Sequence, residues 1–172
     1  SRENRGLGLV PGTTGAVKAT TLASMLEQIN QSFEGKNVVV SGSGNVATYA
    51  VQKATELGGK VVTLSDSGGF IHDPDGIDPD KLAYVIDLKT VHRGRISDYA
   101  EKYKKATFHQ GQRPWGVPCD IALPCATQNE LEESEAKELI KNGVIAVSEG
   151  ANMPSTDGAI KAFHANKKIF AP

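Results

Sequence analysis

The sequence contains few cysteines and no excess of either charge. Only Cys119 and Cys125 occur among its 172 residues, too few for the disulfide framework of a small secreted domain. We therefore expect a reducing, cytoplasmic setting in which both thiols act as small apolar core residues. Lysine and arginine total 19 and aspartate and glutamate total 20, so the net charge is -1. This balance creates no field that attracts nucleic acid or an anionic membrane surface, and neither is expected as a partner.

Long apolar runs and metal-ligand patterns are also missing. No run approaches the roughly 18 residues that a membrane span needs, and the start, SRENRGLGLVPG, lacks the apolar core of a signal peptide. HDPDGIDPD, residues 72–80, places its glycine too early for a calcium loop, which predicts a surface turn. No zinc-ligand spacing relates the histidines, which are His72, His92, His109 and His164. The sequence therefore indicates no metal site, and it offers no Ser-His-Asp or Cys-His catalytic set.

Helical and extended patterns alternate along the chain. Helices are expected over residues 14–30, 45–57, 79–91, 96–106, 129–143 and 156–168. Short apolar strands are expected over residues 38–40, 60–66, 119–126, 144–151 and 169–172. This alternation predicts βαβ units and strands covered on both faces. The expected fold class is α/β, a Rossmann-like doubly wound, mainly parallel sheet with helices on both faces, in one domain over residues 1–172.

Two glycines join the first predicted strand to the helix that follows it. The segment VVVSGSGNVA, residues 38–47, has the G-x-G-x-x-A spacing of a dinucleotide-binding loop. Gly42 would permit a tight turn, and Gly44 would let a pyrophosphate lie against the backbone. Amides at the helix N-terminus would then point at the phosphates. The candidate loop residues are Ser41, Gly42, Ser43, Gly44, Asn45 and Val46; a plain strand-to-helix turn is the alternative.

The end of the second predicted strand bears on which dinucleotide is bound. Ser65, Asp66 and Ser67 follow the glycine loop by roughly the 20 residues that separate the loop from the ribose-binding carboxylate in such folds. A carboxylate here can accept hydrogen bonds from the adenosine ribose, which favours NAD. It would repel a 2'-phosphate unless cations stood nearby, and Lys89, Arg93 and Arg95 are candidates. A solvated helix end and loop is the other interpretation of these cations.

Polar residues follow two later strands. PCATQNEL and SEGANMP place Thr127, Gln128, Asn129 and Asn152 where strands should end. In an open parallel sheet, ligands lie across the carboxyl ends of the strands, so these residues are candidates for cofactor contact. Thr127 or Asn129 could instead be the N-cap of the next helix. The two roles are compatible, and both remain open.

Four motifs, taken in order, resemble a known family. VSGSGNVA, SDSGGFI, RPWGVPCDIALPCATQNEL and EGANMP are similar to the nucleotide-binding domain of hexameric, NADP-type glutamate dehydrogenases, from about Pro11 to Pro172. The resemblance implies NADP as cofactor, with NAD as the alternative. It also implies a parent homohexamer that interconverts L-glutamate with 2-oxoglutarate and ammonia by hydride transfer.

The resemblance also implies residue roles. Thr14 and Asn152 would lie near the nicotinamide and its ribose, and Ala126 and Thr127 beside the adenosine and its ribose. The SDS sequence at 65–67 is similar to NADP-preferring members, in which cations matching Lys89 and Arg95 meet the 2'-phosphate. No catalytic or metal-binding residue is implied.

The sequence departs from the family in two respects. Residues 13–17 read TTGAV where the family has Ala-Thr-Gly-Tyr-Gly. The family's substrate domain and C-terminal helices are also expected to lie outside this chain, so the chain alone should bind dinucleotide without turning over glutamate. Two alternatives stay open: a related dehydrogenase of branched or aromatic amino acids, and a non-catalytic nucleotide-binding module.

Overall fold

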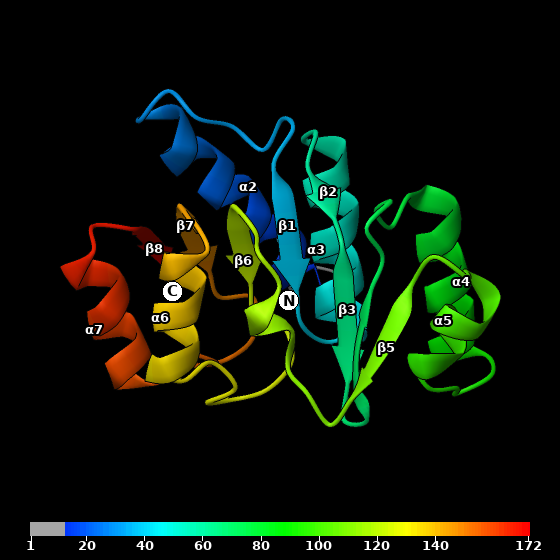
Figure 1. The fold of residues 1–172 in the computed structure, drawn as a ribbon. Helices are drawn as coiled ribbons and strands as arrows, with labels where there is room; N and C mark the ends of the chain where they lie inside the picture. The colour runs from blue at the N-terminus through cyan, green and yellow to red at the C-terminus, as the bar shows by residue number, and fades with distance from the viewer. Residues whose placement is uncertain (1–12) are drawn as a thin grey trace, which may run out of the picture.

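The computed structural model describes residues 13–172. The segment SRENRGLGLVPG, on which the expectation about a signal peptide rests, lies outside the described residues. Five strands form a parallel sheet in the order β2-β1-β6-β7-β8 (Figure 1). Their bounds are β1 (Asn37–Val40), β2 (Lys60–Val61), β6 (Ile121–Leu123), β7 (Ala146–Ser148) and β8 (Ile169–Ala171).

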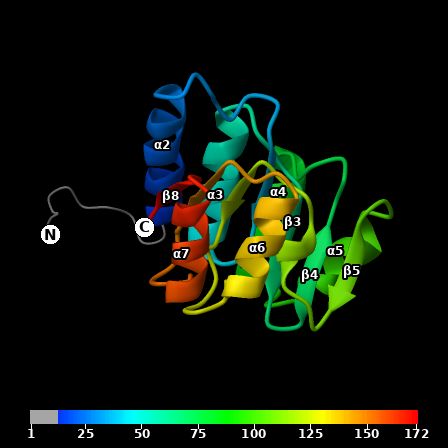
Figure 2. The ribbon, with the colours of Figure 1, turned by 60° about the vertical axis from the view of Figure 1, so that its left-hand side comes forward.

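Helices cover both faces of this sheet, as expected. The helices are α2 (Thr14–Glu27) and α3 (Asn45–Glu56) on one face, and α6 (Glu133–Lys141) and α7 (Asp157–Ala165) on the other (Figures 1 and 2). The valines of strand β1 show why both faces of the sheet are covered. Val38 and Val40 belong to the cluster beneath α2 and α3, whereas Val39 belongs to the cluster beneath α6 and α7. Alternate side chains point to opposite faces of a strand, so a strand apolar throughout is buried twice. The predicted doubly wound fold is confirmed.

A second, antiparallel sheet was not expected. It consists of β3 (Thr63–Asp66), β4 (Gly69–His72) and β5 (Thr107–Gln110), with α4 (Pro79–Thr90) and α5 (Ser97–Lys102) beside it. The single strand predicted over 60–66 is wrong, because the chain leaves the parallel sheet at Val62. The hydroxyl of Thr63 accepts from the Val40 amide at 3.0 Å and donates to the Val40 carbonyl at 2.9 Å. The Thr63 side chain thus satisfies the Val40 amide and carbonyl, which would otherwise pair with the backbone of a longer β2.

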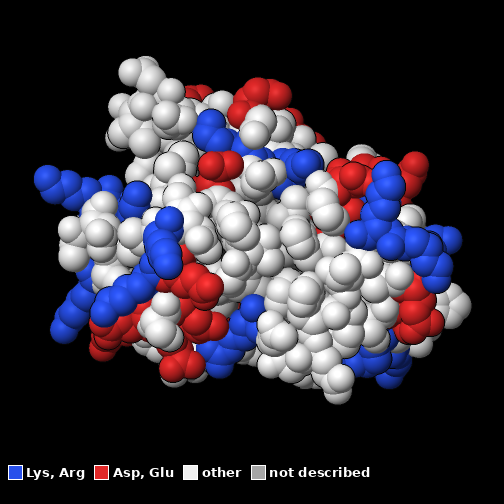
Figure 3. Space-filling model, in the orientation of Figure 1, with Lys and Arg blue, Asp and Glu red and all other residues white. Residues whose placement is uncertain are grey.

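The turn predicted over residues 72–80 is present and contains a buried carboxylate. Asp73 is 1% exposed and accepts from Tyr99 Oη at 2.6 Å and from Lys81 Nζ at 2.9 Å. Asp78 caps α4 by accepting the amide of Lys81. Within residues 13–172, no three metal-ligating side chains gather and no helix is long and apolar enough to cross a membrane. Figure 3 shows Lys and Arg lying beside Asp and Glu at both ends of one face, without a field of one sign.

The order of strands fixes where a ligand can lie. From β1 the chain crosses through α3 to β2 on one side, whereas from β6 it crosses through α6 and α7 to β7 and β8 on the other. The loops that leave β1 and β6 therefore diverge from adjacent strands. In open α/β sheets such a switch point, at the carboxyl ends of the strands, is the place where ligands bind.

Candidate functional site

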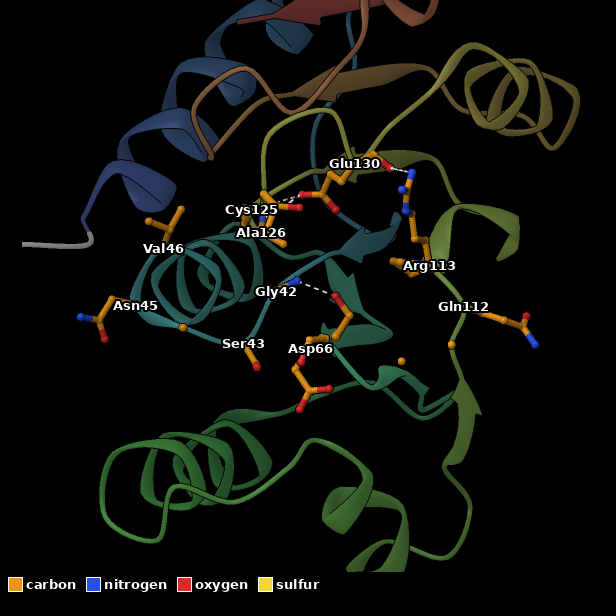
Figure 4. Close-up of a pocket in the computed structure, with 17 residues that line it drawn as sticks. Gly42, Ser43, Asn45, Val46, Asp66, Gln112, Arg113, Cys125, Ala126 and Glu130 are labelled. Carbon is orange, nitrogen blue, oxygen red and sulfur yellow. Dashed lines mark hydrogen bonds between the residues drawn. The ribbon is translucent and has the colours of Figure 1, made fainter.

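A cavity of about 680 Å³ opens at this switch point (Figure 4). It lies between the loop after β1, the end of β3, the segment after β5 and the loop after β6. The structure brings ten of the predicted residues to its wall. They are Gly42, Ser43, Gly44, Asn45, Val46, Ser65, Asp66, Ser67, Ala126 and Thr127.

A second cavity, of about 620 Å³, adjoins the first. Thr14 and Asn152, which the resemblance placed at the nicotinamide end, line this cavity and not the first. Val46, Cys125 and Ala126 line both cavities. An extended ligand could therefore occupy both cavities while passing a shared wall.

Gly42 is a glycine because the fold requires one. Its φ is +88°, and a Cβ added there would lie 2.8 Å from the Cys125 carbonyl oxygen. The loop is also tied to β3, because the Gly42 amide donates to Ser65 Oγ at 2.7 Å and the Ser65 amide donates to the Gly42 carbonyl at 3.0 Å. The β1 loop is thus held tightly against the loop after β6, and any side chain at Gly42 would separate them.

Gly44 is a glycine for a different reason. Its φ is -85°, which any residue adopts, and nothing lies within 4 Å of an added Cβ. Gly44 is also the N-cap of α3, a position where Ser, Asp or Asn would stabilise the helix more. The fold therefore leaves this position free, and the open space belongs to the cavity at a helix N-terminus. Such a site suits an anion lying against the backbone.

Asp66 is held by four donors. Its carboxylate accepts from Lys89 Nζ at 2.8 Å, from the Ile96 amide at 2.8 Å and from the Gly68 amide at 2.9 Å, and Arg95 Nη2 lies 3.2 Å away. Burial by itself would raise the pKa of Asp66, but the Ile96 amide, Lys89 and the Gly68 amide together lower it below the ordinary value. Asp66 therefore stays ionised and holds two cations beside the cavity.

The two cations differ in exposure. The Lys89 side chain is 19% exposed and the Arg95 side chain 54% exposed, and neither lines the cavity. Arg95 also donates to Ser67 Oγ at 2.7 Å. The solvated interpretation is wrong for Lys89, which is largely buried in an ion pair. Arg95 and Ser67 form the outer, accessible part of the cluster.

Ser41 is the predicted loop residue that lines neither cavity. It is fully buried, and its hydroxyl accepts the Cys125 amide at 2.9 Å and hydrogen-bonds to the Glu130 carboxylate. Ser41 is adjacent to Gly42 in the sequence, and for that reason it is among the candidate residues of the glycine loop. Its side chain points instead into the protein, where it joins the β1 loop to the β6 loop.

Sequence reasoning missed several residues of the wall. They are Gly69, Gly111, Gln112, Arg113, Pro114, Cys125 and Glu130. Arg113 Nη1 donates to the Glu130 carbonyl at 2.6 Å and to Glu132 and Glu135 at 3.1 and 3.0 Å. The only available signal was the RPW sequence, which overlaps the start of the 3-10 helix η1 (Pro114–Gly116) and indicates a turn and no particular chemistry.

The predicted capping of α6 is wrong. The N-cap is Glu132, which forms a capping box with Glu135, and neither Thr127 nor Asn129 fills this position. The reciprocal glutamate pair three residues apart satisfies the first amides of the helix, so α6 begins later than expected. Thr127 is exposed on the cavity wall and is left free for another contact.

The two cysteines are buried, as predicted. Burial raises the pKa of Cys119 to about 12 and raises the pKa of Cys125 further. Cys125 faces both cavities but is only 7% exposed. Both thiols therefore stay protonated at neutral pH and act as apolar packing groups.

Comparison with known proteins gives consistent results. The profile of the Glutamate/Leucine/Phenylalanine/Valine dehydrogenase family matches residues 6–172. An NAD(P)-specific glutamate dehydrogenase of Xylanibacter ruminicola is 55% identical over 162 residues, covering 94% of this chain and 36% of the relative. An NADP-specific glutamate dehydrogenase of Haemophilus influenzae is 54% identical with the same coverage of 94% and 36%.

A solved structure agrees in three dimensions. The crystal structure of Plasmodium falciparum glutamate dehydrogenase matches with a TM-score of 0.88 at 46% identity, covering 94% of this chain and 34% of that chain. This chain thus spans about a third of the length of these relatives. The resemblance to glutamate dehydrogenases that the four motifs predict is confirmed. The chain belongs to the glutamate, leucine, phenylalanine and valine dehydrogenase family.

Proposed function

We propose that this chain is the dinucleotide-binding domain of a glutamate dehydrogenase and holds NADP(H). The observation that carries the proposal is the open space at Gly44, where the fold itself has no need of a glycine. A pyrophosphate would lie against that backbone at the N-terminus of α3. The adenosine half would extend toward Ser65–Ser67, and the nicotinamide half toward Thr14 and Asn152.

The cofactor preference rests on the cluster around Asp66. Arg95 and Ser67 present donors at the outer side of this cluster, and Lys89 adds a second positive charge behind them. Two cations facing one carboxylate leave a net positive charge, which favours a 2'-phosphate. The alternative is NAD, with Asp66 accepting from the ribose hydroxyls. The Asp66 carboxylate already accepts hydrogen bonds from several donors of the protein. It therefore has less capacity left for ribose hydroxyls, which weakens this alternative.

The proposed reaction of the whole protein is the reversible oxidative deamination of L-glutamate to 2-oxoglutarate and ammonia. The bound nicotinamide supplies hydride transfer, and this chain binds and orients it. Residues 1–172 would be one domain of a longer, homohexameric, cytoplasmic enzyme, with the substrate domain elsewhere. By itself the chain should bind dinucleotide and leave glutamate unchanged. Its relatives in Xylanibacter ruminicola and Haemophilus influenzae are glutamate dehydrogenases, which favours glutamate over branched or aromatic amino acids as the substrate.

Substitution of the two glycines tests the proposal. Gly44→Asp supplies a preferred N-cap and puts a carboxylate where the pyrophosphate would lie, so folding stability should hold while NADPH binding weakens about 100-fold. Gly42→Ala should destabilise the fold by about 1 kcal/mol or more, because φ is positive and a carbonyl lies close. Calorimetric titration and urea unfolding measure the two effects. Unchanged NADPH affinity in Gly44→Asp would contradict the proposal.

Parallel titrations with NADPH and NADH test the cofactor. We expect tighter binding of NADPH, and loss of the preference in the double variant Lys89→Ala, Arg95→Ala. Lys104→Ala, Lys105→Ala removes two exposed cations from the loop after α5 and serves as the matched control. Tighter binding of NADH by the unaltered chain would instead support the ribose role of Asp66. Failure to bind either dinucleotide would favour a non-catalytic interaction module.

A further inference from the structure

A buried carboxylate lies beneath the exposed loop after β6. Glu130 is 5% exposed, whereas residues 126–129 are exposed. Its Oε2 accepts from the Ala126 amide at 2.9 Å and from the Thr127 amide at 3.0 Å. The Ser41 hydroxyl accepts a hydrogen bond from the Cys125 amide and also hydrogen-bonds to the Glu130 carboxylate. Three successive amides of the loop therefore turn inward onto two buried side chains.

Among residues 13–172, no lysine or arginine forms an ion pair with this carboxylate. Arg113 Nη1 donates to the Glu130 backbone carbonyl at 2.6 Å, and the nearby Trp115 Nε1 donates to the same carbonyl at 3.2 Å. The carboxylate itself relies on amides and on one hydroxyl. Charge-assisted hydrogen bonds of this kind are stronger than neutral ones, and they fix the orientation of the donor peptides.

The carbonyl groups of the loop must point the other way. The described chain has no cis peptide bonds, and in a planar trans peptide the N–H and C=O groups are antiparallel. Because the amides of Ala126 and Thr127 face Glu130, the carbonyls of Cys125 and Ala126 face away from it. The Cys125 oxygen accordingly lies against Gly42, 2.8 Å from where a Cβ would be. In the part of the shared wall that comes from the loop after β6, Cys125 and Ala126, backbone carbonyls rather than amides are thus turned away from the buried carboxylate.

We propose that Glu130, assisted by Ser41, is a positioning residue that sets the hydrogen-bonding polarity of this wall. The wall is then suited to donor-bearing parts of a ligand, hydroxyl or amino groups. Anionic phosphate is left to the amides of the opposite glycine loop. The inference rests on the proposed dinucleotide binding and explains how one site treats sugar and phosphate differently. Glu130 acts through the loop and touches no reacting atom.

We call the arrangement in which the Glu130 carboxylate holds the Ala126 and Thr127 amides the carboxylate clamp. Nuclear magnetic resonance of the ligand-free chain tests it directly. The amide proton shifts of Ala126 and Thr127 should titrate together, with a midpoint above the ordinary glutamate value of 4.5, because burial raises the pKa of Glu130. Arg113 and the Cys125 thiol are the other charged or ionisable groups that influence this carboxylate in the described structure, and burial raises the pKa of the Cys125 thiol well above this range. The titration should vanish in Glu130→Gln. Amide proton shifts that do not change with pH would overturn the proposal.

Substitution separates positioning from simple packing. Glu130→Met keeps the volume but removes the acceptor, so amide exchange at Ala126 and Thr127 should accelerate roughly tenfold or more and NADPH binding should weaken roughly tenfold. Glu130→Gln retains one carbonyl oxygen and should bind NADPH within about threefold of the unaltered chain. Glu138→Met, on the exposed side of α6, is the matched control and should change neither reading.

The outcomes distinguish this inference from the proposed function. Exchange that stays slow in Glu130→Met would overturn the clamp whether or not dinucleotide binds. Equal weakening of NADPH binding by Met and Gln, with unchanged exchange, would also overturn it. A chain whose Ala126 and Thr127 amides titrate as expected, but which binds neither NADPH nor NADH, would keep the clamp and refute the proposed function.

Discussion

Carboxylates are held differently in the two halves of the molecule. Beside the antiparallel sheet, Asp66 and Asp73 hold lysine side chains and Asp66 also holds Arg95. At the edge of the parallel sheet, Glu130 and Glu149 hold backbone amides, those of Ala126, Thr127 and Ser155. The first arrangement retains positive charge near the cavity. The second orders loops through backbone amides, and we propose that the two walls of the site therefore differ in what they recognise.

The largest effect should follow from breaking the buried pair at Asp73. Asp73→Asn leaves Lys81 and Tyr99 without their charged acceptor in a buried position, which should lower the free energy of unfolding by about 3 kcal/mol. Urea unfolding followed by circular dichroism measures this loss. Asp75→Asn, which removes only an exposed partner of Lys105, should cost less than about 0.5 kcal/mol and is the control. Equal losses in the two variants would show that burial does not distinguish them.

A smaller, functional effect should follow from Asp66→Asn. The amide side chain can still accept one backbone hydrogen bond, but Lys89 and Arg95 lose their counter-charge. We expect NADPH binding to strengthen relative to NADH by about fivefold, roughly 1 kcal/mol, because the freed cations favour a 2'-phosphate. Parallel titrations measure the ratio. A shift toward NADH would mean that Asp66 orders the cations more than it neutralises them.

The smallest effect is a difference in pH response between the halves. The pKa of Asp73 is lowered, because the Tyr99 and Lys81 hydrogen bonds outweigh burial; its contribution is complete above about pH 4 and is lost only as the pH falls further. Burial raises the pKa of Glu130, so its ionised form costs stability at neutral pH.

Unfolding between pH 7 and pH 4.5 reveals this difference. The chain should gain stability relative to Glu130→Gln as the pH falls toward 4.5, by at most about 1.4 kcal/mol per unit of pKa shift. The cost of Asp73→Asn should stay constant over the same range. A Glu130→Gln difference that does not change with pH would show that the carboxylate is as well solvated as in the unfolded chain.

The sequence predicts the parallel half of the fold better than the antiparallel half. Apolar strands with intervening amphipathic helices carry a local signal, and their doubly wound arrangement is confirmed. Strand β4 is only four residues long and follows β3 after the two-residue turn Ser67-Gly68, and β5 is half-exposed, so neither stands out in the sequence as a separate strand. The split at Val62 depends on a hydroxyl of Thr63 bonding Val40 across the sheet, which no local pattern reveals.

The site shows the same division. The position of the glycine loop and of Asp66 on the cavity wall was predictable, because their spacing along the chain places them at the carboxyl ends of two successive predicted strands. Glu130 was not, since its partners are defined only when β1 and β6 lie side by side. The Thr127 capping hypothesis failed because Glu132 and Glu135 form a better cap. Local sequence patterns therefore identify residues that line the cavity, and tertiary contacts identify those that order the loops behind them.

The burial of both cysteines has a practical consequence for labelling. Maleimide reagents react with thiolates, and neither Cys119 nor Cys125 forms one at neutral pH. A cysteine introduced at the exposed mouth of the cavity, as in Gln112→Cys, would then be the preferred point of attachment. A fluorophore placed there needs no cysteine-free background and would report ligand entry directly.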